Sequence, residues 1–102
     1  MYDVMFVCSA GMSTSMLVER VKKEAEKAGV EMEVYAMGES EAKKNLDKPQ
    51  VILLGPQVRY MEFAFKKMLE GTDTKLGVIE MRTYGMMDGA KVYSQIAELL
   101  GL

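Results

Sequence analysis

A chain of 102 residues, 49% hydrophobic and 27% charged, is expected to form one globular domain, residues 1–102, because disordered chains have a more polar composition. The net charge of −2 disfavours a nucleic-acid partner, which requires a basic face, and no apolar run approaches the roughly 20 residues that cross a bilayer. One cysteine and no histidine exclude an intramolecular disulfide and a structural zinc site, which fits a metal-free protein of the reducing cytoplasm.

The chain begins with a strand pattern and a helix pattern. The apolar run from Tyr2 to Val7 is typical of a buried strand. The helix after it can be capped by Ser13 or Thr14, and it is expected to extend to about Ala28, where Gly29 suits the stop. Its apolar face consists of residues at spacings of three and four: Leu17, Val18, Val21, Ala25 and Ala28.

The middle of the chain contains two more strand patterns. Met32 to Met37 is predicted as the second strand, and a short helix is expected over Glu39 to Leu46, before Pro49. Val51 to Leu54 is predicted as the third strand. Because this run is apolar throughout, we expect it to be buried on both faces of a sheet.

The last part of the chain repeats the alternation. A helix is predicted over Val58 to Leu69, and a strand over Leu76 to Met81 with an interruption at Gly77. A loop that can contain a helical turn is expected over Thr83 to Gly89, before a final helix over Ala90 to Leu100. The predicted apolar stripes are Val58, Met61, Phe65 and Met68 in the first helix, and Tyr93, Ile96, Ala97 and Leu100 in the second.

Alternating strands and helices predict an α/β fold. Right-handed crossovers give a four-stranded parallel sheet with helices on both faces, for which we predict the strand order 2-1-3-4. Ligands of such sheets bind beyond the carboxyl ends of the strands, at the switch point, which here lies between strands 1 and 3. Three loops are expected to meet there: Cys8 to Ser15, Gly55 to Tyr60, and Arg82 to Asp88.

Cys8 is the candidate nucleophile. It follows a buried strand and precedes a loop of small residues and a helix N-terminus, where free backbone N–H groups and the helix dipole favour a thiolate and bind phosphate. Gly11 permits the tight backbone of an anion-binding nest. The alternative is that Cys8 is a small buried hydrophobic residue at a strand end, and the Ser-rich loop weighs against it.

The loop is similar to that of the low-molecular-weight tyrosine phosphatases, which have Cys-x5-Arg after their first strand. Here the sixth residue after Cys8 is Thr14, so this loop provides no guanidinium to clamp a transferring phosphoryl group. No well-placed aspartate signature for protonating a leaving group is present either. A thiolate nest without these parts suits a phosphoryl carrier better than a fast hydrolase.

The segment Phe6 to Ser15 (FVCSAGMSTS) is the most specific motif of the chain. Two other segments follow it: Val51 to Val58 (VILLGPQV) with Tyr60 and Met61, and Tyr84-Gly85 with Asp88-Gly89. Together they resemble the IIB proteins of the phosphoenolpyruvate-dependent sugar phosphotransferase system (PTS), in the lactose/cellobiose/chitobiose branch. The resemblance covers the whole chain and implies one IIB-type domain with a fold like that of the low-molecular-weight tyrosine phosphatases.

The resemblance implies a phosphotransferase without a cofactor. Cys8 takes a phosphoryl group from a phosphohistidine of a IIA protein and passes it to a sugar presented by the membrane IIC permease. The backbone amides of the loop are then expected to hold the phosphoryl oxygens: Ser9, Ala10, Gly11, Met12, Ser13, Thr14 and Ser15. Phosphoryl transfer depends mainly on positioning and charge stabilisation, so a nest with little acid–base machinery is sufficient.

Partners and location follow from the same resemblance. The expected partners are phosphorylated IIA, IIC and, through IIC, a sugar, with a β-linked disaccharide favoured and cellobiose, chitobiose and lactose all open. The chain start has no signal-peptide pattern, so we expect a cytoplasmic protein that acts transiently at the inner face of the membrane. A monomer is expected, since the sequence has no long hydrophobic surface that a small domain leaves unburied.

Other residues of the three loops are weaker candidates. Pro56 and Gln57 either end a strand or form a wall beside Cys8. Tyr60 and Tyr84 either form the rim of the site and contact partners or are half-buried packing residues. Asp88 is expected mainly as the cap of the last helix.

Two arginines and three methionines complete the list. Arg59 and Arg82 are candidates for phosphate or partner contacts, although neither belongs to the family motif. Met12, Met86 and Met87 fall in the predicted loops beside Cys8, where adaptable side chains suit a surface that binds two partners in turn.

Two other functions stay open. One is a stand-alone cysteine phosphatase or arsenate reductase, against which Thr14 and the lack of a second cysteine weigh. The other is a regulatory module that still uses phosphorylated Cys8. A receiver domain is excluded, because its aspartate at the end of the third strand is replaced by Leu54-Gly55.

Overall fold

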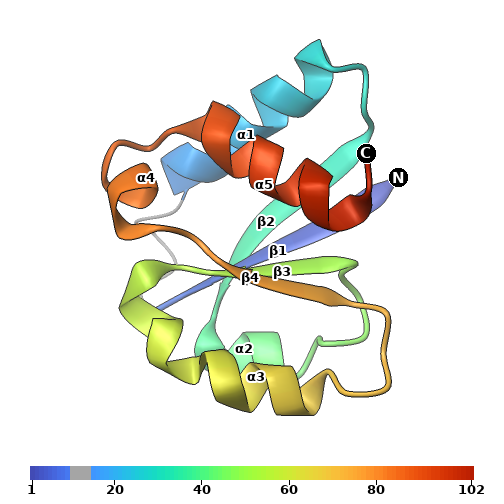
Figure 1. Cartoon of the computed structure of the whole chain (residues 1–102), viewed down its shortest axis with the longest axis vertical. Coiled ribbons are helices and arrows are strands. Elements are labelled where there is room, and N and C mark those ends of the chain that lie inside the picture. Colours follow the sequence, from blue (N-terminus) through green and yellow to red (C-terminus); the bar gives the residue numbers. More distant parts are fainter. Residues whose placement is uncertain (10–14) are drawn as a thin grey trace.

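The computed structural model describes residues 1–9 and 15–102, and a four-stranded parallel sheet runs through them (Figure 1). The strands are β1 (Tyr2–Cys8), β2 (Met32–Gly38), β3 (Val51–Leu54) and β4 (Lys75–Val78). Their order is β2-β1-β3-β4, which confirms the predicted order. All carboxyl ends therefore lie along one edge of the sheet, with Cys8 of β1 opposite Gly38 of β2.

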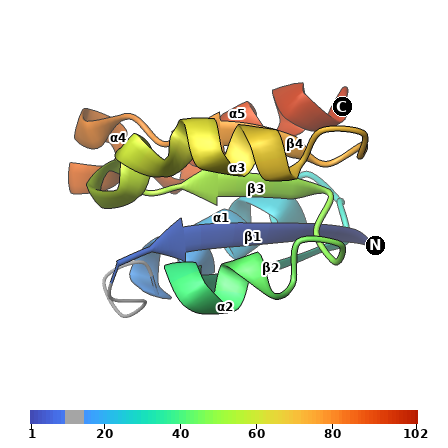
Figure 2. The same ribbon diagram turned by 90° about the horizontal axis from the view of Figure 1, so that it is seen from below.

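Helices cover both faces of the sheet, as expected (Figure 2). One face carries α1 (Ser15–Lys27) and α5 (Gly89–Leu100), and the other carries α2 (Glu39–Lys43), the 3₁₀ helix η1 (Pro56–Met61) and α3 (Glu62–Met68). The short helix α4 (Met81–Gly85) lies at the carboxyl edge. Within the described ranges, no helix is long and apolar enough to span a bilayer.

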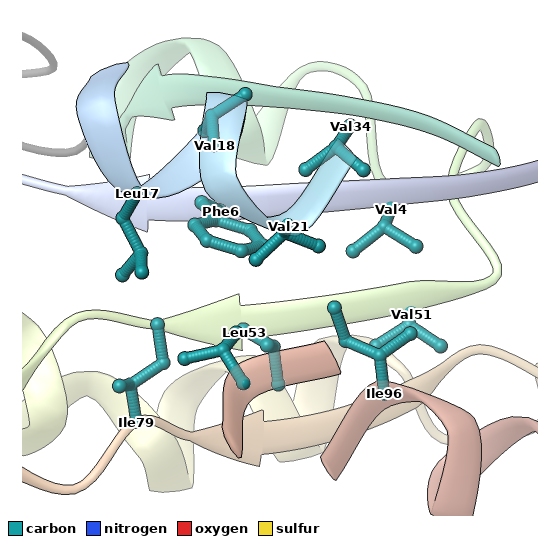
Figure 3. Close-up of a cluster of buried hydrophobic side chains, with 11 residues drawn as sticks. Val4, Phe6, Leu17, Val18, Val21, Val34, Val51, Leu53, Ile79 and Ile96 are labelled. Atoms are coloured by element: carbon teal, nitrogen blue, oxygen red, sulfur yellow. The ribbon is translucent and has the colours of Figure 1, made fainter. Parts of the chain in front are cut away.

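Strand alternation divides the hydrophobic core into two halves. Val4 and Phe6 of β1 pack under α1, where Leu17, Val18 and Val21 point toward the sheet (Figure 3). Met5 and Val7 of the same strand face the other way and pack against α2, η1 and α3. Every residue of β3 is buried, as its apolar run predicted, because helices cover both of its faces.

The predicted strand over Leu76 to Met81 is wrong at its end. The strand is Lys75–Val78, uninterrupted at Gly77, and Met81–Gly85 is helical, so the predicted loop over Thr83 to Gly89 begins as a helix. Ile79 explains the error: its N–H still donates to the Leu54 carbonyl at 2.9 Å and its side chain is buried, although it lies beyond the strand. The end of an apolar run in the sequence therefore does not identify the last residue of the strand.

The predicted helix over Val58 to Leu69 is two helices. A 3₁₀ turn starts at Pro56, Val58 has non-helical torsions (φ −117°, ψ 19°), and a regular helix runs only over α3. The buried stripe also differs at its end, since Met68 is 39% exposed while Leu69 is buried.

Two smaller differences concern helix ends, and one prediction there is untested. The residue Ala28, expected in the apolar stripe of the first helix, lies beyond α1 and is exposed, whereas the other four members are buried. The helix α2 ends at Lys43 and not at Leu46, which packs against the second half of the core. The predicted caps Ser13 and Thr14 lie outside the described residues.

Candidate functional site

Cys8 is the last residue of β1 and is fully buried. Strand alternation places it on the same face as Phe6, the face that α1 covers. Helix α1 starts at Ser15, with its N-terminal end at the carboxyl edge of the sheet, so its dipole favours negative charge beside the end of β1. The strand predicted before the Cys8 loop and the helix predicted after it are therefore both present.

Ser9 and Ser15, the two ends of the predicted phosphate loop, are both exposed. The five residues between them lie outside the described residues: Ala10, Gly11, Met12, Ser13 and Thr14. The structure therefore brings the two ends of the loop to one edge of the sheet and leaves its amide nest a prediction.

The turn after β3 approaches Cys8 closely. The N–H of Gly55 donates to the Val7 carbonyl at 2.8 Å, and a Cβ added to Gly55 would lie 3.8 Å from the Cβ of Cys8 and 2.7 Å from Oε1 of Gln57. A side chain at this position would displace the amide end of Gln57, an exposed side chain that can move aside. Pro56 starts the 3₁₀ turn, so the strand-ending role of Pro56 and Gln57 is observed, and Gly55 brings their turn beside Cys8.

A cleft of about 450 Å³ opens at this edge. Its lining comes from the ends of three strands and the segments after them: Ser9, Gly38, Glu39, Ser40, Glu41, Val58 and Tyr60. Tyr60 is 75% exposed, so it is a rim residue and not a packing residue. Arg59 and Arg82 are exposed, and neither is among the residues that line the cleft.

The α4–α5 turn is built mainly for packing. Tyr84 and Met87 are partly buried against the α1 side of the core, whereas Met86 is 65% exposed. The carboxylate of Asp88 accepts a hydrogen bond from the Lys91 backbone N–H at 3.1 Å, which confirms its predicted role as the cap of the last helix.

Sequence reasoning missed a close joint between α1 and this turn. The Arg20 guanidinium donates to the Met87 carbonyl at 2.9 Å, and a Cβ on Gly89 would lie 2.6 Å from the Cβ of Arg20. Met87 has a positive φ of 50°, which non-glycine residues rarely adopt. Gly89 was the available signal, because a glycine at a helix start can mark close backbone approach.

Sequence reasoning also missed the acidic wall of the cleft. Glu39 and Glu41 belong to the first turn of α2, which was predicted as a weak helix without a place beside the loops. The register between Cys8 and Gly38 brings them to the site, and that register cannot be read from the separate strand patterns.

The chain matches known proteins over nearly its full length. A family model described as "PTS system, Lactose/Cellobiose specific IIB subunit" matches residues 3–95. A PTS oligo-beta-mannoside-specific EIIB component of Bacillus subtilis (strain 168) is 37% identical over 100 residues, covering 98% of this chain and 97% of that protein. Two PTS EIIB components of Lactococcus lactis, one galactose-specific (strain MG1363) and one cellobiose-specific (strain IL1403), are each 37% identical over 102 residues, covering 95% of this chain and 94% of each protein.

Solved structures agree with the fold. A lactose-specific IIB component domain from Streptococcus pneumoniae superposes with a TM-score of 0.86 at 16% identity, covering 95% of both chains. A cellobiose-specific phosphotransferase IIB component from Borrelia burgdorferi gives a TM-score of 0.78 at 31% identity, covering 96% of this chain and 90% of that one. The sheet order and the helical layers are therefore shared with IIB domains, whose fold is like that of the low-molecular-weight tyrosine phosphatases.

Proposed function

We propose that Cys8 is the phosphoryl carrier of this chain, which belongs to the family of lactose/cellobiose-specific IIB subunits of the sugar phosphotransferase system. IIB components are phosphotransferases, and the chain contains one sulfur nucleophile and no histidine. The observation that carries the proposal is the position of Cys8, at the carboxyl end of a central strand and at the edge of the sheet where α1 begins.

Two displacements at phosphorus make up the proposed reaction. In the first, the Cys8 thiolate attacks the phosphorus of a IIA phosphohistidine, so that an S–P bond forms and the P–N bond breaks with its electron pair on the imidazole. In the second, a sugar hydroxyl presented by the IIC permease attacks the phosphorus, the S–P bond breaks, the thiolate leaves and the hydroxyl proton is released. The amides of Ser9 to Ser15 are proposed to hold the phosphoryl oxygens, with the α1 dipole in support.

The proposed sugar is a β-linked disaccharide. The relatives named above are specific for oligo-beta-mannoside, galactose and cellobiose at the same level of identity, so identity alone does not select among these sugars. Two of the three names denote β-linked sugars, which favours that class. In this proposal, the permease selects which β-linked disaccharide is transported.

The remaining parts of the proposal concern setting and assembly. We propose a single IIB domain, residues 1–102, that works as a monomer in the cytoplasm, reaches the inner face of the membrane transiently and has no nucleic-acid partner. The lack of a long apolar helix in the described ranges and the net charge of −2 are consistent with this setting.

The rival function, a stand-alone cysteine phosphatase, makes a different prediction. The protein would be incubated with phosphoenolpyruvate, the two general phosphotransferase proteins and a IIA protein of the lactose/cellobiose class, and inorganic phosphate release would be followed beside aryl phosphate hydrolysis. A carrier takes up at most one phosphoryl group per chain and releases little phosphate. Steady release of phosphate in the relay mixture, or steady hydrolysis of the aryl phosphate by the protein alone, would favour the phosphatase if Cys8→Ser abolished it.

A further inference from the structure

The cleft beside Ser9 has a negative wall. Glu39 and Glu41 line it together with Ser40 and Tyr60, and no lysine or arginine is among its described lining residues. Glu39 is partly neutralised by Lys43, whose Nζ lies 3.1 Å from its Oε2. The Glu41 carboxylate is exposed and forms no ion pair with any residue of the described ranges, so the cleft keeps a net negative charge.

This charge lies at the same edge of the sheet as the proposed phosphoryl group. Cys8 is opposite Gly38 in neighbouring strands, about 4.8 Å apart in such sheets, and Glu39 follows Gly38 directly. Ser9, the residue after Cys8, lines the same cleft as both glutamates, so a phosphorylated Cys8 adds negative charge at an edge that is already acidic, and like charges there repel one another. A cation that enters the cleft would relieve this repulsion.

The shape and chemistry of the cleft fit a basic side chain. Carboxylates beside the ring of Tyr60, which is 75% exposed, offer both ion pairing and a cation–π contact to a guanidinium or ammonium group. A volume of about 450 Å³ accommodates such a side chain together with neighbouring residues of its segment.

We propose, building on the carrier function above, that this cleft seats a basic cytoplasmic segment of the membrane permease. Cytoplasmic loops of membrane proteins are enriched in lysine and arginine close to the bilayer, so the permease presents the matching charge. The protein is itself acidic, with a net charge of −2, and the inner membrane surface is negative, so docking needs a specific basic contact. Glu39 and Glu41 are docking residues for the second transfer step.

The experiment compares two variants that each remove two negative charges. Glu39→Gln/Glu41→Gln removes them from the cleft, and Glu26→Gln/Glu31→Gln removes them from a hollow at the opposite, amino edge of the sheet. Each protein, loaded with phosphate, is titrated into inside-out vesicles that contain a permease for cellobiose, oligo-beta-mannoside or galactose and for which the wild type supports sugar phosphorylation. We expect the cleft variant to raise the KM for the phosphorylated protein about fivefold at low salt without lowering kcat, and the control to stay within about twofold of wild type.

Salt and the aromatic ring provide two further readouts. The difference in KM between the cleft variant and wild type is expected to vanish at high salt, because the attraction is then screened. Tyr60→Phe keeps the ring face and is expected to keep the wild-type KM, whereas Tyr60→Ala raises it.

The first transfer step is measured separately, as phosphorylation of each variant by phosphorylated IIA. If the cleft variant is slowed there as much as with the permease, the cleft serves IIA and the permease assignment is wrong. An unchanged KM and an unchanged salt dependence with the vesicles would overturn the docking proposal while Cys8 still carried phosphate. Failure of the wild type itself to take phosphate from IIA, or to support sugar phosphorylation in any of the vesicles, would instead contradict the carrier function.

Discussion

The two ends of β1 lie in different surroundings. At the amino end, the Tyr35 hydroxyl donates to the Asp3 carboxylate, the Asp3 N–H donates to the Gln50 side-chain carbonyl at 2.9 Å, and the Lys48 ammonium lies 4.5 Å above the Tyr35 ring. These contacts tie together β1, β2 and the segment before β3. The polar groups of this edge bind one another, as expected of a structural region.

The carboxyl end leaves its side chains open to solvent. Ser9 and Glu41 are exposed there, the ring of Tyr60 is mostly in solvent, and a cleft opens between them. With the proposed carrier function, the same sheet fixes its strands at one edge and carries its chemistry at the other. Substitutions at the amino edge should therefore change stability, and those at the carboxyl edge should change transfer.

The largest effect is expected from Cys8→Ser. A hydroxyl at this position is a much poorer nucleophile than a thiolate at neutral pH, so sugar phosphorylation should be lost while the fold is kept. Transfer assays and thermal unfolding of both proteins check this. Phosphorylation by IIA retained in the variant would contradict the role of Cys8. An unfolded variant would show that a residue of the carboxyl edge also determines stability, against the contrast between the two edges.

Gly89→Ala should have the next largest effect. Its added Cβ would meet the backbone of Arg20 at 3.0 Å and the Arg20 Cβ at 2.6 Å, so α5 must move away from α1, at a cost of about 1–3 kcal/mol in the free energy of unfolding. Gly85→Ala is the matched control, because nothing lies within 4 Å of the Cβ added there. Equal stabilities of the two variants in urea would mean that the joint is not tightly packed.

Asp88→Ala should cost about 1 kcal/mol in the free energy of unfolding, since it removes the cap that accepts the Lys91 N–H. Asp88→Asn keeps an acceptor at the same place and should retain most of that stability. Denaturant titrations of the two variants distinguish a cap from a site residue. A normal stability with lost transfer in Asp88→Ala would show that the residue acts at the site instead.

The smallest effect concerns pH. Burial first, and then the hydrogen bond to Asp3, raises the pKa of Tyr35 above its ordinary value. The neutral phenol is therefore favoured in the folded state: its contribution to stability is complete below about pH 10, the pKa in the unfolded chain, and is lost as the pH rises from there toward the folded pKa. Wild type should lose stability more steeply than Tyr35→Phe above that pH. Parallel curves of unfolding free energy against pH would argue against the raised pKa, and so against the burial of Tyr35 and its contact with Asp3.

Much of the fold could be predicted from local patterns. The run of β3 is apolar throughout because both faces are covered, and Cys8 stands out because a strand, small residues and a helix follow one another there. These features depend on neighbours in sequence, which is why they are readable. The family was likewise identifiable, since the motif around Cys8 is contiguous.

The features that the sequence did not reveal depend on spatial neighbours. The buried side chain of Ile79 concealed the end of β4, and α4 begins at Met81, where the strand was still expected. The acidic wall from α2 reaches the site only through the pairing of β1 with β2, and the bond from Arg20 to the Met87 carbonyl joins residues 67 positions apart. No local pattern records such contacts.

The most direct test of the central claim is intact-protein mass spectrometry. The protein would be incubated with phosphoenolpyruvate, the two general phosphotransferase proteins and a IIA protein of the lactose/cellobiose class, beside the Cys8→Ser variant. The carrier assignment predicts a gain of one phosphoryl group that requires both IIA and Cys8. No gain in the wild type with relay proteins shown to be active, or an equal gain in the variant, would contradict it.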